Sequence, residues 1–78
     1  MPRRTLTEIA TEIRRDWTNP YFGAVPYINA MSLLTGVNDM YGQDRAEDIV
    51  RYFLANSRTW RGETARRVKA ELKAMINN

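Results

Sequence analysis

Hydrophobic residues recur at a helical period near the start of the chain. The apolar positions of this first stripe follow one helix face, at i, i+3, i+4, i+7 and i+11: Leu6, Ile9, Ala10, Ile13 and Trp17. Thr5 precedes the stripe and Glu8 follows three residues later, which is the spacing of a capping box. The pattern predicts a helix over residues 6–16.

A second helix is expected over about residues 25–34, after the Asn19-Pro20 break. Pro26 is tolerated in its first turn. The segment YINAMSLL is apolar nearly all round, which favours a central, buried element. Gly36 stands where a C-terminal cap belongs.

Two further amphipathic segments complete the pattern. The segment GVNDMYGQD is expected to be a loop, and Asp44 with Glu47 to cap the third helix. The buried stripe of the third helix is predicted to be Ala46, Ile49, Val50, Phe53 and Ser57. A fourth helix should begin between Trp60 and Glu63 and run to about Ile76, burying Ala65, Val68, Leu72 and Met75 or Ile76.

These stripes predict an all-α fold, a compact bundle of about four short helices in one domain over residues 1–78. Residues 1–4 are expected to form a flexible basic arm. The chain has 78 residues, which is near the lower limit for a domain that folds alone. No run is long and apolar enough for a membrane helix, and no secretory signal precedes the first stripe. We expect a soluble, cytoplasmic protein.

The residue composition removes several kinds of chemistry. The chain contains no cysteine and no histidine. The usual zinc ligand sets, Cys/His nucleophile pairs and Ser-His-Asp triads are therefore excluded. The acidic group Asp39, Asp44, Glu47 and Asp48 does not have calcium-loop spacing, and no phosphate-binding glycine motif is present. We expect no enzyme, no cofactor, no metal and no small-molecule substrate.

Basic residues are concentrated in the last third of the chain. Residues 51–78 hold seven basic and two acidic residues, whereas residues 1–50 hold five basic and seven acidic ones. On the predicted fourth helix, Arg66, Lys69 and Lys73 share one flank and form an uncompensated ridge. On the other flank, Arg67 is expected to pair with Glu63 and Glu71 at i, i+4 spacing. The ridge is either a solvated face or a surface that follows phosphates.

The segment SRTWRG adds cations next to this ridge. Arg58 and Arg61 could hold an anion at the start of the fourth helix. Trp60 between them could stack on a base, but a tryptophan in a short turn more often closes the core, and we expect Trp60 and Trp17 to be buried. A helix–turn–helix reading of the third and fourth helices is a weak match, because the linker is long and Glu63 would repel phosphate.

Aromatic residues form a second candidate surface. The segment NPYFGAVPY places Tyr21, Phe22 and Tyr27 around a glycine and two prolines. Partly exposed tyrosines are common at protein interfaces, although they can equally complete a small core. Eight aromatic side chains in so small a domain also favour a homodimer.

Several longer strings resemble one protein group. YFGAVPY with a following AM, IVRYFLAN and TWRGETARRVKAELK are similar to small uncharacterised proteins encoded by actinobacteria and their bacteriophages. The similarity runs from about Asp16 to Met75. It implies a bacterial cytoplasmic setting and a phage or prophage gene. It carries no activity and no functional residue with it.

Two functions remain open from the sequence. One is a small non-enzymatic interaction or regulatory protein that binds a host protein or itself through its aromatic and basic helical surface. The other is a nucleic-acid-binding protein. Its contact residues would be Arg58, Arg61, Arg66, Lys69 and Lys73, with Arg3 and Arg4 as an arm. The first is favoured because Glu63 and Glu71 interrupt the basic helix.

Overall fold

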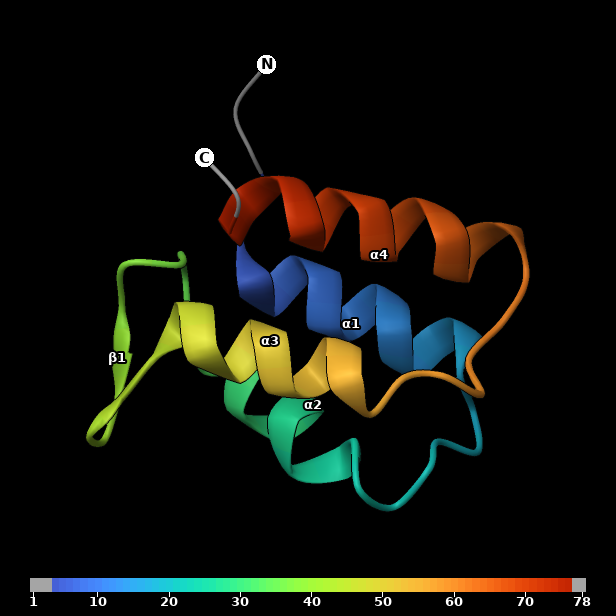
Figure 1. Ribbon diagram of the computed structural model, residues 1–78, viewed down its shortest axis with the longest axis horizontal. Coiled ribbons are helices and arrows are strands. Elements are labelled where there is room, and N and C mark those ends of the chain that lie inside the picture. Colours follow the sequence, from blue (N-terminus) through green and yellow to red (C-terminus); the bar gives the residue numbers. More distant parts are fainter. Residues whose placement is uncertain (1–3, 77–78) are drawn as a thin grey trace.

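The computed structural model describes residues 4–76, and its main elements are helices (Figure 1). In chain order the elements are α1 (Leu6–Asp16), α2 (Val25–Met31), β1 (Met40–Tyr41), β2 (Asp44–Arg45), α3 (Ala46–Ala55) and α4 (Glu63–Ile76). The expectation of a mostly helical chain is confirmed, with one small hairpin that the sequence did not predict. No helix within residues 4–76 has the length and apolar character needed to cross a membrane.

The first helix begins and ends where its sequence pattern predicts. The Thr5 hydroxyl accepts from the Glu8 amide, and the Glu8 carboxylate accepts from the Thr5 amide, so both bonds of the capping box are present. The five stripe residues named above are all buried. The stripe packs α1 against α2 and α4, which lies alongside it in Figure 1. Burial of this face provides the main hydrophobic stabilisation of α1.

The third and fourth helices also bury their predicted stripes. Ala46, Ile49, Val50, Phe53 and Ser57 are buried, and so are Ala65, Val68, Leu72 and Met75. The third helix packs against α2 and α4. One core therefore joins all four described helices.

The second helix is shorter and more exposed than predicted. It ends at Met31, and Leu33 beyond it is 73% exposed. The chain turns away because the Leu34 and Thr35 carbonyls accept hydrogen bonds from the Thr7 and Leu6 amides, at 3.0 and 2.8 Å. Those two amides open α1 and have no partner within it, so the turn after α2 satisfies the start of α1.

Gly36 does not cap α2, contrary to expectation. The capping position is Ser32, and Gly36 does not adopt a positive φ. Its amide donates to the Asp39 carboxylate at 3.1 Å, beside the Thr35 amide at 2.8 Å. These two bonds lower the pKa of the Asp39 carboxyl, because they favour its charged form.

The segment expected to be a loop contains an antiparallel hairpin. Met40 pairs with Arg45 and Tyr41 with Asp44 across a two-residue connection. Gly42 has a φ of 61°. A positive φ is favoured at the first of the two residues that connect the strands of such a tight hairpin. The predicted capping role of Asp44 is wrong: it lies in β2, and α3 starts after Arg45 with no side-chain cap.

Candidate functional site

The turn between α3 and α4, residues 56–62, is built around a buried tryptophan. Trp60 is 2% exposed and stacks on Trp17, with ring centroids 5.7 Å apart and planes at 9°. Phe53 packs edge-on against it at 6.2 Å. Its Nε1 donates to the Asp16 carboxylate at 2.8 Å. The prediction that both tryptophans belong to the core is confirmed.

Lys69 does not lie free on a basic ridge. Its Nζ donates to the backbone carbonyls of Ser57 and Trp60, at 2.7 and 2.6 Å, and lies 5.8 Å from the centre of the Trp60 ring. Burial lowers the pKa of Lys69, and the charges of Lys73 and Arg61 lower it further. The predicted ridge is interrupted in its middle, because Lys69 holds the turn in place.

A hollow opens beside this turn, at the C-terminal end of α3. Its volume is about 410 Å³. The residues around it come from the α1–α2 connection, the end of α3 and the turn: Tyr21, Ala55, Asn56, Arg58, Thr59 and Arg61. Two of the predicted anion-binding residues therefore lie next to one of the predicted interface residues. Asn56 and Thr59 were not predicted, because no sequence pattern marks them.

Gly23 lets the Tyr21 ring reach this position. A Cβ atom at residue 23 would lie 2.5 Å from the Tyr21 ring and 2.9 Å from the Asn56 side-chain oxygen. Both distances are shorter than van der Waals contact allows. The absence of a side chain at Gly23 thus lets Tyr21 approach the end of α3.

The predicted aromatic residues fall into two pairs. Tyr21 is exposed, Phe22 is 80% exposed, and their ring centroids are 4.8 Å apart. Tyr27 is partly buried against the core and lies 5.5 Å from the exposed ring of Tyr52 on α3. Tyr21 and Phe22 are therefore available to a partner, and Tyr27 is less so.

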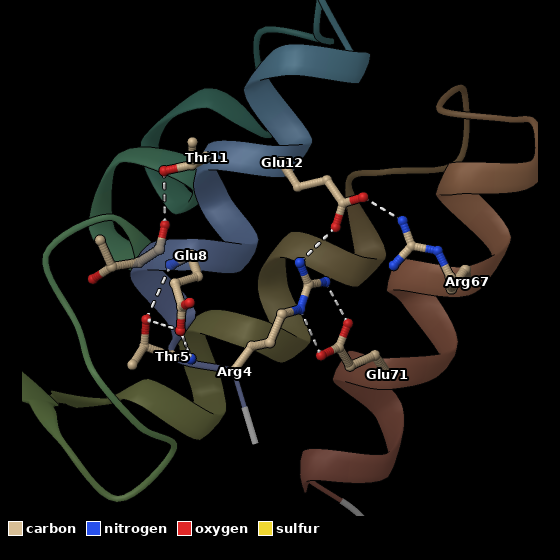
Figure 2. A network of polar contacts seen from close by, with 8 residues as sticks. Arg4, Thr5, Glu8, Thr11, Glu12, Arg67 and Glu71 are labelled. Carbon is tan, nitrogen blue, oxygen red and sulfur yellow. Dashed lines mark hydrogen bonds and ion pairs between the residues drawn. The ribbon is translucent and has the colours of Figure 1, made fainter. Parts of the chain in front are cut away.

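The flank of α4 opposite the predicted basic ridge is joined to α1 by ion pairs (Figure 2). The Arg4 guanidinium donates to Glu71 at 3.0 and 2.5 Å and lies 2.7 Å from a Glu12 oxygen. The other Glu12 oxygen accepts from Arg67. The bond to Arg67, and then those to Arg4, lower the pKa of the Glu12 carboxyl, and Glu71 raises that of Arg4.

This network corrects two predictions. Arg67 pairs with Glu12 of α1 and not with Glu63 or Glu71 of its own helix. Arg4, expected in a flexible arm, is held by two carboxylates. Arg3, the other basic residue of that arm, lies outside the described residues. The charge of Glu71 is therefore compensated by Arg4 on this flank, away from Arg66 and Lys73.

Acid should weaken the protein through Glu12. A carboxyl with a lowered pKa stabilises the fold above its unfolded pKa of about 4.3, and this contribution is lost as the pH falls through the lower folded value. Glu12→Gln should cost about 1 kcal/mol at pH 7 and much less near pH 3. Urea unfolding at pH 7, 5 and 3 measures the loss of stability at each pH.

Glu63→Gln is the control, since Glu63 forms no ion pair among residues 4–76. Equal losses for Glu12→Gln at pH 7 and pH 3 would contradict this role.

In the turn and α4, four exposed cations form no ion pair within the described part of the chain: Arg58, Arg61, Arg66 and Lys73. Two of them border the hollow. No group of three or more acidic side chains within residues 4–76 is arranged to hold a metal ion. The hollow therefore offers positive charge, a tyrosine ring and neutral polar groups.

Comparisons with protein-family models, with curated proteins and with solved structures gave no significant match to this chain.

Proposed function

We propose that this chain is a small non-enzymatic interaction protein that binds a partner protein through an aromatic–arginine surface. We define this surface as Tyr21, Phe22, Arg58 and Arg61. The observation that carries the proposal is the hollow, which brings Tyr21 together with two arginines that have no ion pair within residues 4–76. Tyrosine and arginine are the residue types that most often dominate protein interfaces, together with tryptophan.

Phe22 supports the same proposal. Its ring is 80% exposed. A partner that covers this apolar ring removes it from water, which lowers the free energy of the complex. The resemblance noted in the sequence extends the proposal to a host protein in a bacterial cytoplasm, with the chain encoded by a phage or prophage.

Nucleic-acid binding is the second candidate. Arg66 and Lys73 add to the charge of Arg58 and Arg61 along α4, and Glu71 is bound by Arg4 on the other flank of the helix. The inward position of Lys69 argues against it, because the row of cations then has a gap at its centre. A short cluster of arginines beside an apolar ring is better suited to binding a protein surface than to binding a continuous phosphate backbone.

A pull-down from bacterial lysate tests the proposal. We expect a bound protein that survives nuclease treatment and is lost with Phe22→Ala and with the pair Arg58→Ala and Arg61→Ala. Arg14→Ala on α1 is the matched control and should retain it, because Arg14 is exposed and is not one of the residues that line the hollow.

The opposite results would support the second candidate. Release by nuclease, or affinity that falls with salt at a log–log slope near −0.9 per neutralised phosphate, indicates nucleic acid. Full retention by Phe22→Ala would contradict the aromatic–arginine surface.

A further inference from the structure

The outer face of α3 carries a partly exposed stripe, in which Tyr52 also contacts a neighbouring helix, through Tyr27 of α2. Asp48, Tyr52 and Ala55 follow one another at i, i+4 and i+7 and therefore share one side of the helix. The Tyr52 ring is 46% exposed in the middle of this stripe, and the Asp48 side chain is 42% exposed. The core-facing residues of α3 lie on its other side, towards α2 and α4. In Figure 1 this helix lies in the foreground.

The charge along this face changes sign from one end to the other. Asp44, Glu47 and Asp48 lie at the N-terminal end of α3 together with Arg45 and Arg51, so the net charge of this end is −1 (three acidic and two basic residues). Arg58 and Arg61 border the hollow that continues from Ala55 at the C-terminal end. Arg51 pairs with Glu47 and Asp48 and reduces the negative charge, but Asp44 forms no ion pair within residues 4–76.

Exposed apolar side chains also occur at both ends. Met40 and Tyr41 are exposed on the hairpin that precedes α3. Tyr21 and Phe22 are exposed beside the hollow at its C-terminal end. In Figure 1 the hairpin and the turn to α4 lie at opposite ends of α3.

We propose that this face binds a second copy of the same chain, with the two α3 helices antiparallel about a twofold axis near Tyr52. Such an interface is isologous, so each contact occurs twice. In this arrangement Asp48 of one copy faces Arg58 of the other, and Asp44 faces Arg61. The exposed hairpin of each copy approaches the Tyr21–Phe22 pair of the other.

The self-complementary order of charges is what selects a second copy over an unrelated partner. A face with a net negative charge at one end, Tyr52 near the middle and two arginines at the other end is complementary in net charge to its own inverted copy. The parallel arrangement would place like charges together and is disfavoured. This inference rests on the proposed function, since it uses the same aromatic–arginine surface and names one partner for it.

Charge-swapped variants test the pairing by sedimentation equilibrium from about 10 μM to 1 mM, a range that covers weak and moderate homodimers. We expect the wild-type chain to form a dimer. Arg58→Glu with Arg61→Glu should weaken it at least about 30-fold, because each reversal acts twice across the twofold axis. Asp44→Lys with Asp48→Lys should do the same. An equimolar mixture of the two variants should form a heterodimer of near wild-type affinity.

Two further variants complete the design. Tyr52→Ser should weaken the dimer without a change of charge, and Arg66→Glu with Lys73→Glu, on the exposed side of α4, should leave it intact. A wild-type monomer at 1 mM, or a mixture that stays monomeric, overturns the antiparallel pairing. A monomer that still captures a protein through Phe22 in the pull-down leaves the proposed function standing, so the two failures are distinguishable.

Discussion

Replacement of Trp60 with alanine should lower the free energy of unfolding by about 3–5 kcal/mol. The indole is almost fully buried, stacks on Trp17 and meets Phe53 edge-on, so its removal leaves a cavity where three elements join. The Asp16 carboxylate also loses the donor at 2.8 Å. Because domains are stable by only about 5–15 kcal/mol, this loss takes away a large part of the total.

Urea unfolding of wild type, Trp60→Ala and Trp60→Phe measures the effect. The phenylalanine variant keeps most of the stacking area and loses the bond to Asp16, so it should be intermediate. A change below about 1 kcal/mol for Trp60→Ala would mean that the ring is not packed as described.

Lys69→Met should lower the free energy of unfolding by about 2–3 kcal/mol, an unusually large loss for the replacement of a lysine between the exposed basic residues Arg66 and Lys73 of α4. Methionine keeps the aliphatic stem but provides no donor for the Ser57 and Trp60 carbonyls. Hydrogen bonds to charged groups contribute about 1.5–3 kcal/mol, and partly buried acceptors left without a donor add a desolvation cost.

Arg66→Met and Lys73→Met are the matched controls on the same side of α4. Neither residue makes an ion pair within residues 4–76, and each change should stay within about 0.5 kcal/mol. The same urea series compares all three. Equal effects at residues 66, 69 and 73 would mean that Lys69 is not held by the turn. The basic ridge would then be continuous, as the sequence predicts, and the objection to a phosphate-binding surface would no longer apply.

Three of the four described helices could be predicted closely from the sequence. In α1, α3 and α4 the apolar residues occupy one face at a clear period, and this face is the one that the core requires. The second helix has apolar residues nearly all round, so its pattern identifies neither a buried face nor an end. Leu33 looks like a core residue in such a pattern and is nevertheless exposed.

The hairpin and the start of α3 could not be read from local rules. Each strand has two residues, too few for an alternating pattern. Asp44 stands three residues before Glu47 and matches a capping box as well as Thr5 does. The pairing of Tyr41 with Asp44 is a competing local structure that the spacing does not reveal.

The candidate site was predictable in its residues but not in its arrangement. Tyr21, Arg58 and Arg61 were identified by residue type, whereas their meeting at one hollow depends on how α1 and α2 are connected. The partners of Lys69 and Arg67 depend on contacts between elements. The i, i+4 spacing rule assigned Arg67 to Glu63 and Glu71 of its own helix. Spacing along one helix is the only signal for an ion pair that a single sequence offers.

The attachment of α4 to α1 has a consequence for the order of events during synthesis. The α1–α2 contact joins segments close in sequence and becomes available early, whereas Arg4 and Glu71 are 67 positions apart. The ribosome must therefore release almost all of the described chain before the side of α1 that faces α4 is covered. Until then, the apolar side chains of α1 that face α4 remain accessible to water and to chaperones, a state that favours aggregation. Completion of α4 is the step that ends this exposure.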